Sequence, residues 1–128
     1  MWDLPTSPEV ATALSQIYAA GGIVAAVCHG PAALVGAKKP DGTPLVAGLR
    51  VAAFSNEEEV LAGLDKTVPF LLETRLVGLG ARYQRGPVWK SFAVRDGRLV
   101  TGQNPASSEA VAKAVLEALA TELVEAAA

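Results

Sequence analysis

The residues best suited to chemistry are a cysteine and a histidine that stand side by side. Cys28 is the only cysteine of the chain, and His29 is its only histidine. A thiolate is a strong nucleophile, and an imidazole can move the proton that the thiol must lose. One Cys and one His cannot supply the three or four ligands of a typical zinc site, so we expect no metal and no other cofactor. A lone cysteine also forms no internal disulfide, which fits a reducing cytoplasm.

The residues around this pair predict a sharp turn between a strand and a helix. Residues 23–27 are apolar at every position, as in a central parallel strand, and Cys28 follows at once. Such an elbow exposes the side chain and places it at a helix N-terminus, which should lower the pKa of the thiol. The N–H groups of His29 and Gly30 could hold an oxyanion. Gly30 is expected to relieve crowding behind the turn, and Pro31 suits an early helical position.

A less reactive interpretation remains open for both residues. Free cysteines are often small, buried and inert, so Cys28 could simply fill part of the core. His29 could likewise be a structural residue beside it. The pattern by itself supports an activated cysteine without fixing the reaction.

The remaining pattern alternates helices with strands, which predicts an α/β layered fold. Predicted helices cover about 8–20, 32–35, 56–64 (capped by Asn56), 68–79 and a last segment starting near Ser107 or Ser108. That last helix should bury Val111, Val115, Leu116, Leu119 and Leu123. Predicted strands are 23–27, 49–54, 82–84, and a hairpin of 92–94 with 99–101 around Asp96-Gly97. The buried strand 23–27 has few candidate neighbours, so the sheet looks incomplete.

Composition narrows the class of protein further. The chain has 128 residues, half of them apolar, and a net charge of −2, which fits one domain over residues 1–128. This balance offers no basic surface for nucleic acid. Apolar runs are too short for a transmembrane helix, and the first residues lack the pattern of a signal peptide. We therefore expect a cytoplasmic protein with no nucleic-acid or membrane partner.

Several segments resemble one family, in that family's order along the chain. They are Ala25-Ala26-Val27-Cys28-His29-Gly30-Pro31-Ala32-Ala33-Leu34, Phe54-Ser55-Asn56-Glu57-Glu58-Glu59, Val68-Pro69-Phe70-Leu71-Leu72-Glu73 and residues 96–108. Together they resemble the ThiJ/PfpI superfamily, which is class I glutamine amidotransferase-like, and within it the chaperone and glyoxalase III branch. The resemblance implies a flavodoxin-like α/β/α sandwich with a mostly parallel sheet. It covers the domain from the helix before the nucleophile strand to the C-terminal helix.

The resemblance also implies a catalytic acid in addition to the Cys-His pair. By its position after Phe54-Ser55-Asn56, Glu59 best matches that acid, although Glu57 and Glu58 are immediate neighbours and remain alternatives. The implied site is thus Cys28, His29 and Glu59. The implied activity is conversion of small 2-oxoaldehydes such as methylglyoxal to hydroxy acids, without glutathione, through a hemithioacetal on Cys28.

Three other functions stay open at this point. The chain could be a holdase chaperone or stress protein, an intracellular cysteine peptidase or amidase, or a catalytically inactive fragment. Members of the family carry further residues upstream, including a glutamate beside the nucleophile and a glycine-rich segment. We therefore expect the N-terminal side of the fold to be incomplete. The uncovered strand would favour a homodimer or other self-association.

Overall fold

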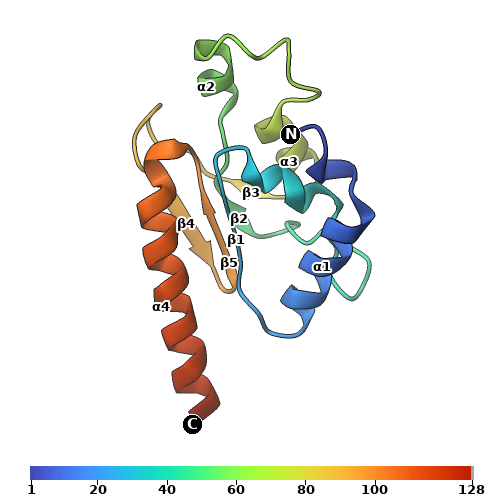
Figure 1. The fold of residues 1–128 in the computed structure, drawn as a ribbon, viewed down its shortest axis with the longest axis vertical. Coiled ribbons are helices and arrows are strands. Elements are labelled where there is room, and N and C mark those ends of the chain that lie inside the picture. The colour runs from blue at the N-terminus through green and yellow to red at the C-terminus, as the bar shows by residue number, and fades with distance from the viewer. Residues whose placement is uncertain (128) are drawn as a thin grey trace.

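A computed structural model describes residues 1–127 of the chain (Figure 1). Its helices are η1 (Leu4–Thr6), α1 (Pro8–Ala19), η2 (Gly30–Gly36), α2 (Asn56–Leu61), α3 (Leu72–Gly78), η3 (Pro105–Ser107) and α4 (Ser108–Ala127), where η denotes a 3-10 helix. Its strands are β1 (Val24–Val27), β2 (Arg50–Val51), β3 (Arg82–Tyr83), β4 (Ala93–Asp96) and β5 (Leu99–Gly102). Strands thus alternate with helices, as predicted.

The strands form two small sheets. The first has the order β1-β5-β4, with β1 parallel to β5 and β4 antiparallel to β5. Val24 lies opposite Leu99 and Val27 opposite Gly102, which brings the end of β1 beside the end of β5. The second sheet is the parallel pair of β2 and β3. The predicted hairpin is confirmed, and its turn contains Gly97 at a φ of 59°.

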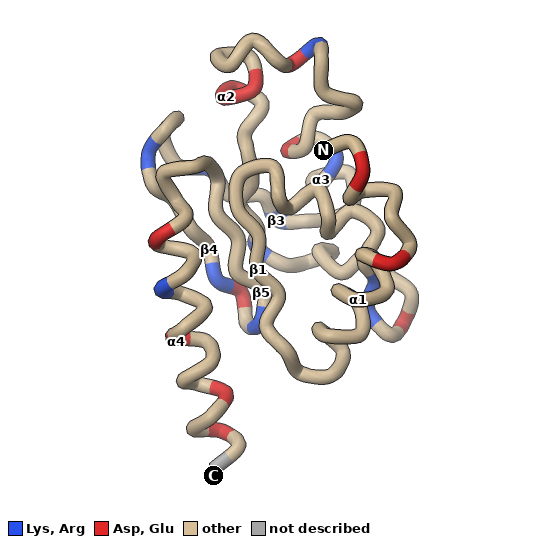
Figure 2. Tube along the Cα trace, in the orientation of Figure 1, with Lys and Arg blue, Asp and Glu red and all other residues tan. Residues whose placement is uncertain are grey.

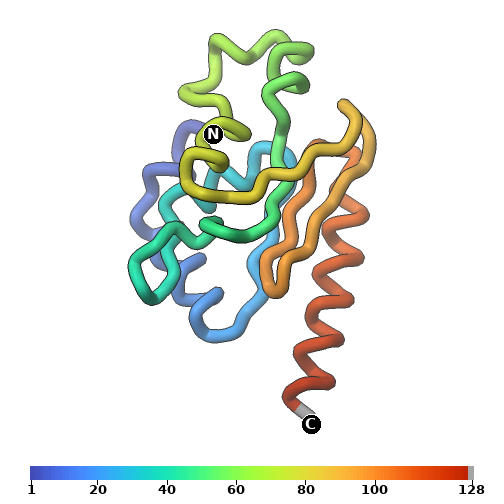
Figure 3. Tube along the Cα trace, turned by 180° about the vertical axis from the view of Figure 1, so that it is seen from behind, coloured from blue at the N-terminus to red at the C-terminus, as the bar shows by residue number. Residues whose placement is uncertain are grey.

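Helices and the second sheet cover the two faces of the β1-β5-β4 sheet. Helix α4 packs against all three of its strands, whereas β2 contacts β4 and β5 from the other face. Figures 1 and 3 show α1 and α4 on opposite sides of the molecule. The main core lies between β1, η2, α3 and the second sheet and contains Val24, Leu34, Leu45, Val51, Leu72, Leu76 and Leu99. The fold is therefore a mixed, layered α/β fold.

Strand β1 departs from the prediction of a central strand buried on both faces. Among the described residues it pairs only with β5, so its other edge has no strand beside it. Val24 is buried, but Ala25 is exposed and Ala26 and Val27 are half-buried. The apolar run of residues 23–27 predicts that both faces are covered, and this prediction is wrong for Ala25, Ala26 and Val27. The expectation of an incomplete sheet agrees with the open edge.

Local bonds explain why some predicted elements are shorter. The strand predicted for 49–54 narrows to β2, because the N–H of Ala52 donates to the side chain of Thr101 instead of a strand backbone. The helix predicted for 68–79 begins only at Leu72 and has no side-chain cap. Ser55, not Asn56, caps α2.

The first and last helices begin as predicted. The side chain of Ser7 caps α1, and Gly21 follows the helix at a φ of 92°. Helix α4 begins at Ser108, but its buried stripe differs from the predicted one. Val111 and Ala118 are buried, whereas Leu116, Leu119 and Leu123 are 67, 46 and 72% exposed. The apolar side of α4 is therefore only partly covered.

Candidate active site

Cys28 sits at a strained elbow immediately after β1. Its φ is 64°, in the left-handed region that non-glycine residues seldom adopt. The N–H of Cys28 donates to the carbonyl of Gly102 at 3.0 Å, and its carbonyl accepts from the N–H of Phe54 at 2.9 Å. Two elements distant in sequence therefore hold the strained conformation in place. The predicted elbow at the carboxyl end of a strand is confirmed, and such strain is commonly stored at functional sites.

The three residues predicted for the site lie together. Sγ of Cys28 is 3.6 Å from Nδ1 of His29, and Nε2 of His29 is 2.6 Å from Oε2 of Glu59. A carboxylate accepts hydrogen bonds, so the proton of the neutral imidazole belongs on Nε2. This tautomer leaves Nδ1 free to accept the proton of the thiol. Cys28, His29 and Glu59 thus form a continuous path for proton transfer.

The other two glutamates of α2 lie outside this path. Glu57 is exposed and sits 3.8 Å from Arg85. Glu58 is fully buried, and its two carboxylate oxygens accept five hydrogen bonds. The donors are the N–H and hydroxyl of Ser55, the side-chain amides of Gln103 and Asn104, and the N–H of Trp89. Glu59 is therefore the glutamate that contacts His29.

Hydrogen bonding decides the charge of Glu58. Burial alone would raise the pKa of this carboxyl, because it disfavours the charged form. The bonds from Trp89, Asn104 and Ser55 more than offset burial and lower the pKa below its usual value. Glu58 is therefore an ionised carboxylate in a fully bonded pocket next to the candidate site.

The thiol itself differs from the sequence-based expectation. We predicted a lowered pKa for Cys28, but burial raises it above its ordinary value. A hydrogen bond from the backbone of His29 lowers it, whereas the charges of Glu58 and Glu59 raise it further. Figure 2 shows no Lys or Arg along β1 and η2 that could favour a thiolate. This environment favours the neutral thiol, so a base is needed to activate it, and His29 is the base in contact with it.

The turn after Cys28 also corrects one prediction and confirms another. A Cβ at Gly30 would meet the Cβ of Ala26 at 3.5 Å, an ordinary contact, so crowding does not require glycine there. Pro31 lies in the first turn of η2, as expected. His29 is the N-cap of η2 and Gly30 its first residue. The first N–H groups of a helix have no partner within it, which leaves them available to an anionic oxygen.

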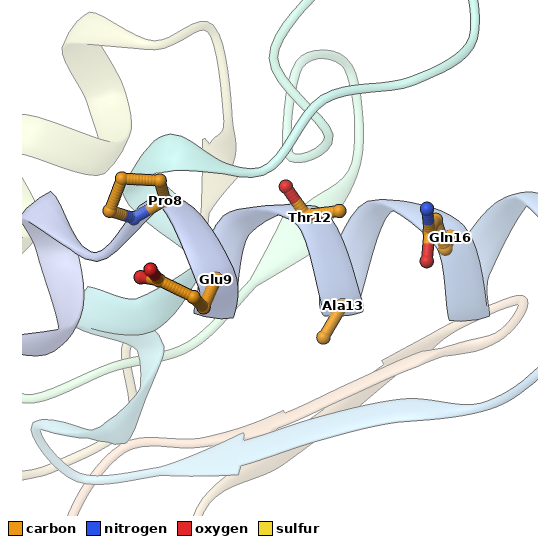
Figure 4. A pocket seen from close by; sticks show the side chains of 5 residues that line it. All are labelled: Pro8, Glu9, Thr12, Ala13 and Gln16. Carbon is orange, nitrogen blue, oxygen red and sulfur yellow. The ribbon is translucent and has the colours of Figure 1, made fainter.

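The described residues show no second centre with comparable chemistry. A shallow pocket lies along α1 and is lined by Pro8, Glu9, Thr12, Ala13 and Gln16 of that helix (Figure 4). None of these residues belongs to the Cys28 site. Within residues 1–127, no three His, Cys, Asp or Glu side chains are grouped as metal ligands. No helix in the same range is long and apolar enough to cross a membrane.

Sequence reasoning missed the residues that bind Glu58, the neighbour of Glu59. The pattern Ser55-x-x-Glu58 is the signature of a capping box, and the structure contains that box. This signal could have separated Glu58 from Glu59. Gln103 and Asn104 fall in the segment 96–108 that carried the family resemblance, but their contact with Glu58 bridges distant positions. No local sequence pattern predicts such a contact.

Comparison with known proteins relates this chain to the glutathione-independent glyoxalases. No family model matches the chain. A glutathione-independent glyoxalase of Saccharomyces cerevisiae is 38% identical over 126 residues, covering 93% of this chain and 53% of that protein. The solved structure of glyoxalase III from Candida albicans matches with a TM-score of 0.83 and 32% identity, over 91% of this chain and 52% of the other.

Two further solved structures agree with this fold. The rapid encystment protein of Francisella tularensis has a TM-score of 0.89 and 39% identity, over 92% of this chain and 52% of that one. A two-domain Anabaena variabilis protein with a DJ-1/ThiJ/PfpI-like domain matches at 0.63 and 23% identity, over 91% of this chain and 26% of that one. The latter likeness concerns the fold alone.

The fold is therefore that of DJ-1/ThiJ/PfpI-like domains, with a cysteine at the elbow after β1. The chain is homologous to the glutathione-independent glyoxalases. It spans about half the length of the curated relatives it matches, 53% in the case of the Saccharomyces protein.

Proposed function

We propose that this chain acts as a cysteine-dependent, glutathione-independent glyoxalase on small 2-oxoaldehydes such as methylglyoxal. The observation that carries the proposal is the path from Sγ of Cys28 through His29 to the buried carboxylate of Glu59. Homology to glutathione-independent glyoxalases supports the choice of substrate class. The product would be the corresponding 2-hydroxy acid, and no metal or other cofactor takes part.

The first step forms a carbon–sulfur bond. Nδ1 of His29 accepts the proton of the Cys28 thiol, and the resulting thiolate attacks the aldehyde carbon. Glu59 stabilises the imidazolium through its contact with Nε2. The carbonyl oxygen becomes an alkoxide, and the N–H groups of His29, the N-cap of η2, and of Gly30 stabilise it until the imidazolium protonates it. The product of this step is a hemithioacetal.

The second step moves hydrogen within the bound molecule. His29 removes the proton from the former aldehyde carbon to give an enediol, and a proton is returned to the neighbouring carbon. The former aldehyde carbon is then the carbonyl of a thioester, and the former ketone carbon bears a hydroxyl. Water adds to the thioester, and the carbon–sulfur bond breaks. The hydroxy acid leaves, and Cys28 regains its proton.

A comparison of the native chain with Cys28→Ser tests the proposal. Each protein is incubated with methylglyoxal without glutathione, and NMR follows loss of the dicarbonyl and appearance of lactate. The native chain should produce lactate, and Cys28→Ser should reduce the rate by at least about a hundredfold. Equal lactate formation by the two proteins would exclude Cys28 as the nucleophile. Consumption of methylglyoxal without lactate would indicate simple adduct formation.

A holdase chaperone is the second candidate, because several large apolar side chains are exposed. They are Val60, Leu61, Leu116, Leu123 and Val124, each at least 58% exposed. Apolar surface of this kind binds unfolded chains, and such binding needs no thiol. If the protein is a holdase, Cys28→Ser should suppress aggregation of a heat-denatured client as well as the native chain does.

The remaining expectations are part of the same proposal. We place the protein in the cytoplasm, where its free thiol would stay reduced, as one domain over residues 1–128. The uncovered edge of β1 and the exposed leucines of α4 support self-association, with a homodimer as the simplest form. No nucleic-acid or membrane partner is included. Light scattering of the isolated chain tests the assembly state.

A further inference from the structure

Trp89 adopts a backbone conformation that is costly for a bulky side chain. Its φ is 59°, and within residues 1–127 only one other non-glycine residue, the elbow residue Cys28, has a positive φ. A large aromatic residue in this region needs surrounding structure to hold it there. Trp89 is nevertheless 44% exposed, so burial in the core does not explain the strain.

The buried carboxylate of Glu58 holds this strained residue. Oε2 of Glu58 accepts a hydrogen bond from the N–H of Trp89 at 2.9 Å. The carbonyl of the next residue, Lys90, accepts from the side-chain amide of Asn104, which also donates to Glu58. Glu58 therefore connects the backbone of Trp89 to α2, the helix that carries Glu59.

The indole is the outer member of a row of rings that ends at His29. The centroids of Trp89 and Phe54 are 5.7 Å apart, and those of Phe54 and His29 are 4.2 Å apart. Phe54 is buried, and its N–H holds the carbonyl of Cys28. Trp89 is thus the exposed end of a row of rings that starts at His29, the general base of the proposed reaction.

We propose that Trp89 is a specificity-determining residue of the Cys28 site. Backed by the buried ring of Phe54, its indole forms an aromatic wall that contacts the substituent on the carbonyl compound attacked by Cys28, and Glu58 is the positioning residue for that wall. The inference rests on the proposed function for its substrate class. It adds that the site prefers 2-oxoaldehydes with aromatic or bulky apolar substituents over methylglyoxal.

Turnover of phenylglyoxal and methylglyoxal by variants of the full chain tests the wall. The readout is the ratio of kcat/KM for the two substrates. Trp89→Gly should lower this ratio about three- to tenfold, mainly by raising KM for phenylglyoxal, because it removes one aromatic contact. Glycine accepts a positive φ without strain, so the melting temperature should stay equal or rise. Trp89→Phe should retain most of the ratio.

Two matched variants separate the wall from general surface effects. Trp2→Ala removes the other tryptophan, which is 60% exposed, and should leave the ratio unchanged. Glu58→Gln should lower the ratio in the same direction as Trp89→Gly, whereas Glu57→Gln should not. If Glu58→Gln does not fold, Trp89→Gly decides alone. An unchanged ratio in a folded Trp89→Gly protein would overturn the proposal.

Alkylation of Cys28 keeps this inference separate from the glyoxalase proposal. Phenacyl bromide and bromoacetone carry the same two substituents and react with a thiol by forming a carbon–sulfur bond and releasing bromide. The proton of the thiol passes to His29 or water. If the chain turns over no dicarbonyl but Trp89→Gly lowers the phenacyl preference, the wall stands and the glyoxalase proposal fails. If Trp89→Gly changes neither the ratio of the two turnover rates nor the ratio of the two labelling rates, the aromatic wall is refuted and the glyoxalase proposal is unaffected.

Discussion

Glu58 and Glu59 are adjacent and equally buried, but they face regions built in opposite ways. On the side of Glu58, five donors from α2, the loop before β4 and the segment after β5 occupy both carboxylate oxygens. On the side of Glu59, one oxygen contacts His29 and the other, Oε1, has no partner among the described residues. The thiol lies 3.6 Å from His29, longer than a strong hydrogen bond.

This contrast separates rigidity from reactivity within one short helix. A carboxylate that accepts five bonds must remain charged and fixed, so Glu58 serves to hold segments together. A sparsely bonded chain of Glu59, His29 and Cys28 can let protons move, because each member keeps an unused position. The same residue type therefore does structural work at one position and is suited to chemistry at the next.

Glu59→Gln should produce the largest effect of the variants that separate the two regions. The amide oxygen can still accept the hydrogen bond from Nε2 of His29, but the charge that stabilises the imidazolium is lost. Methylglyoxal turnover should fall about a hundredfold, the lower end expected for loss of acid–base assistance, while the fold is kept. Steady-state kinetics and circular dichroism check the two parts. Unchanged turnover in Glu59→Gln, with loss of turnover in a folded Glu58→Gln, would reverse the assignment.

Glu58→Gln should instead act on stability. An amide NH₂ would face the N–H of Trp89 or the side-chain amides of Gln103 and Asn104, leaving buried donors without acceptors. The free energy of unfolding should fall by about 1–3 kcal/mol, measured by urea denaturation. Glu57→Gln, at an exposed position, should change it by less than about 0.5 kcal/mol. Similar values for the two variants would contradict a structural role for Glu58.

Two glycines near the elbow give a sharper test of packing. A Cβ at Gly102 would lie 2.6 Å from Val111 and 2.9 Å from Ser107, so α4 would have to move. Gly102→Ala should destabilise the fold by about 1–3 kcal/mol, as overpacking does. Gly30→Ala, with only an ordinary contact, should cost less than about 0.5 kcal/mol. A greater loss for Gly30→Ala in thermal or urea unfolding would show that the elbow needs a glycine after all.

The smallest effect concerns the thiol at alkaline pH. Burial, together with the charges of Glu58 and Glu59, raises the pKa of Cys28 in the folded chain above that of the unfolded chain, about 8.5. The Cys28 thiol then keeps its proton to a higher pH in the folded chain than in the unfolded chain. The free energy of unfolding is therefore at its full value below about pH 8.5, and it falls as the pH rises through the folded pKa. Relative to Cys28→Ser, the native chain should lose stability as the pH rises above about 8.5. A gain over that range would mean that the folded thiol is the more acidic one.

Sequence patterns anticipated the parts of the molecule that depend on neighbouring residues. The turn at Gly97, the start of α1 near Pro8 and the elbow at Cys28 all follow from short motifs, and the structure contains each of them. Glu59 was chosen from three adjacent glutamates by family resemblance, and the structure brings it to His29. These features need little information from distant residues.

The errors arose where distant residues decide the outcome. The raised pKa of Cys28 depends on burial and on charges contributed by α2, which a local elbow pattern does not contain. The strand predicted for 49–54 lost its later residues because the side chain of Thr101 and the carbonyl of Cys28 take their N–H groups. Exposure of Leu116 and Leu123 likewise depends on what lies beside α4. Hydrophobic periodicity shows that one face of a helix is apolar, but it does not show which residues pack against that face.

The parallel pairing of β1 with β5 has a consequence for how the protein is made. Val24 pairs with Leu99, and the N–H of Cys28 bonds to Gly102, so the elbow is fixed by residues from the last third of the chain. During synthesis from the N-terminus, the thiol emerges long before the residues that constrain it. Such non-local pairing forms late and slowly in folding. Until the hairpin is released from the ribosome, Cys28 is an ordinary, solvent-accessible cysteine, open to oxidation or to mixed disulfides with cellular thiols. The nascent chain is therefore most vulnerable at the residue on which its chemistry would depend.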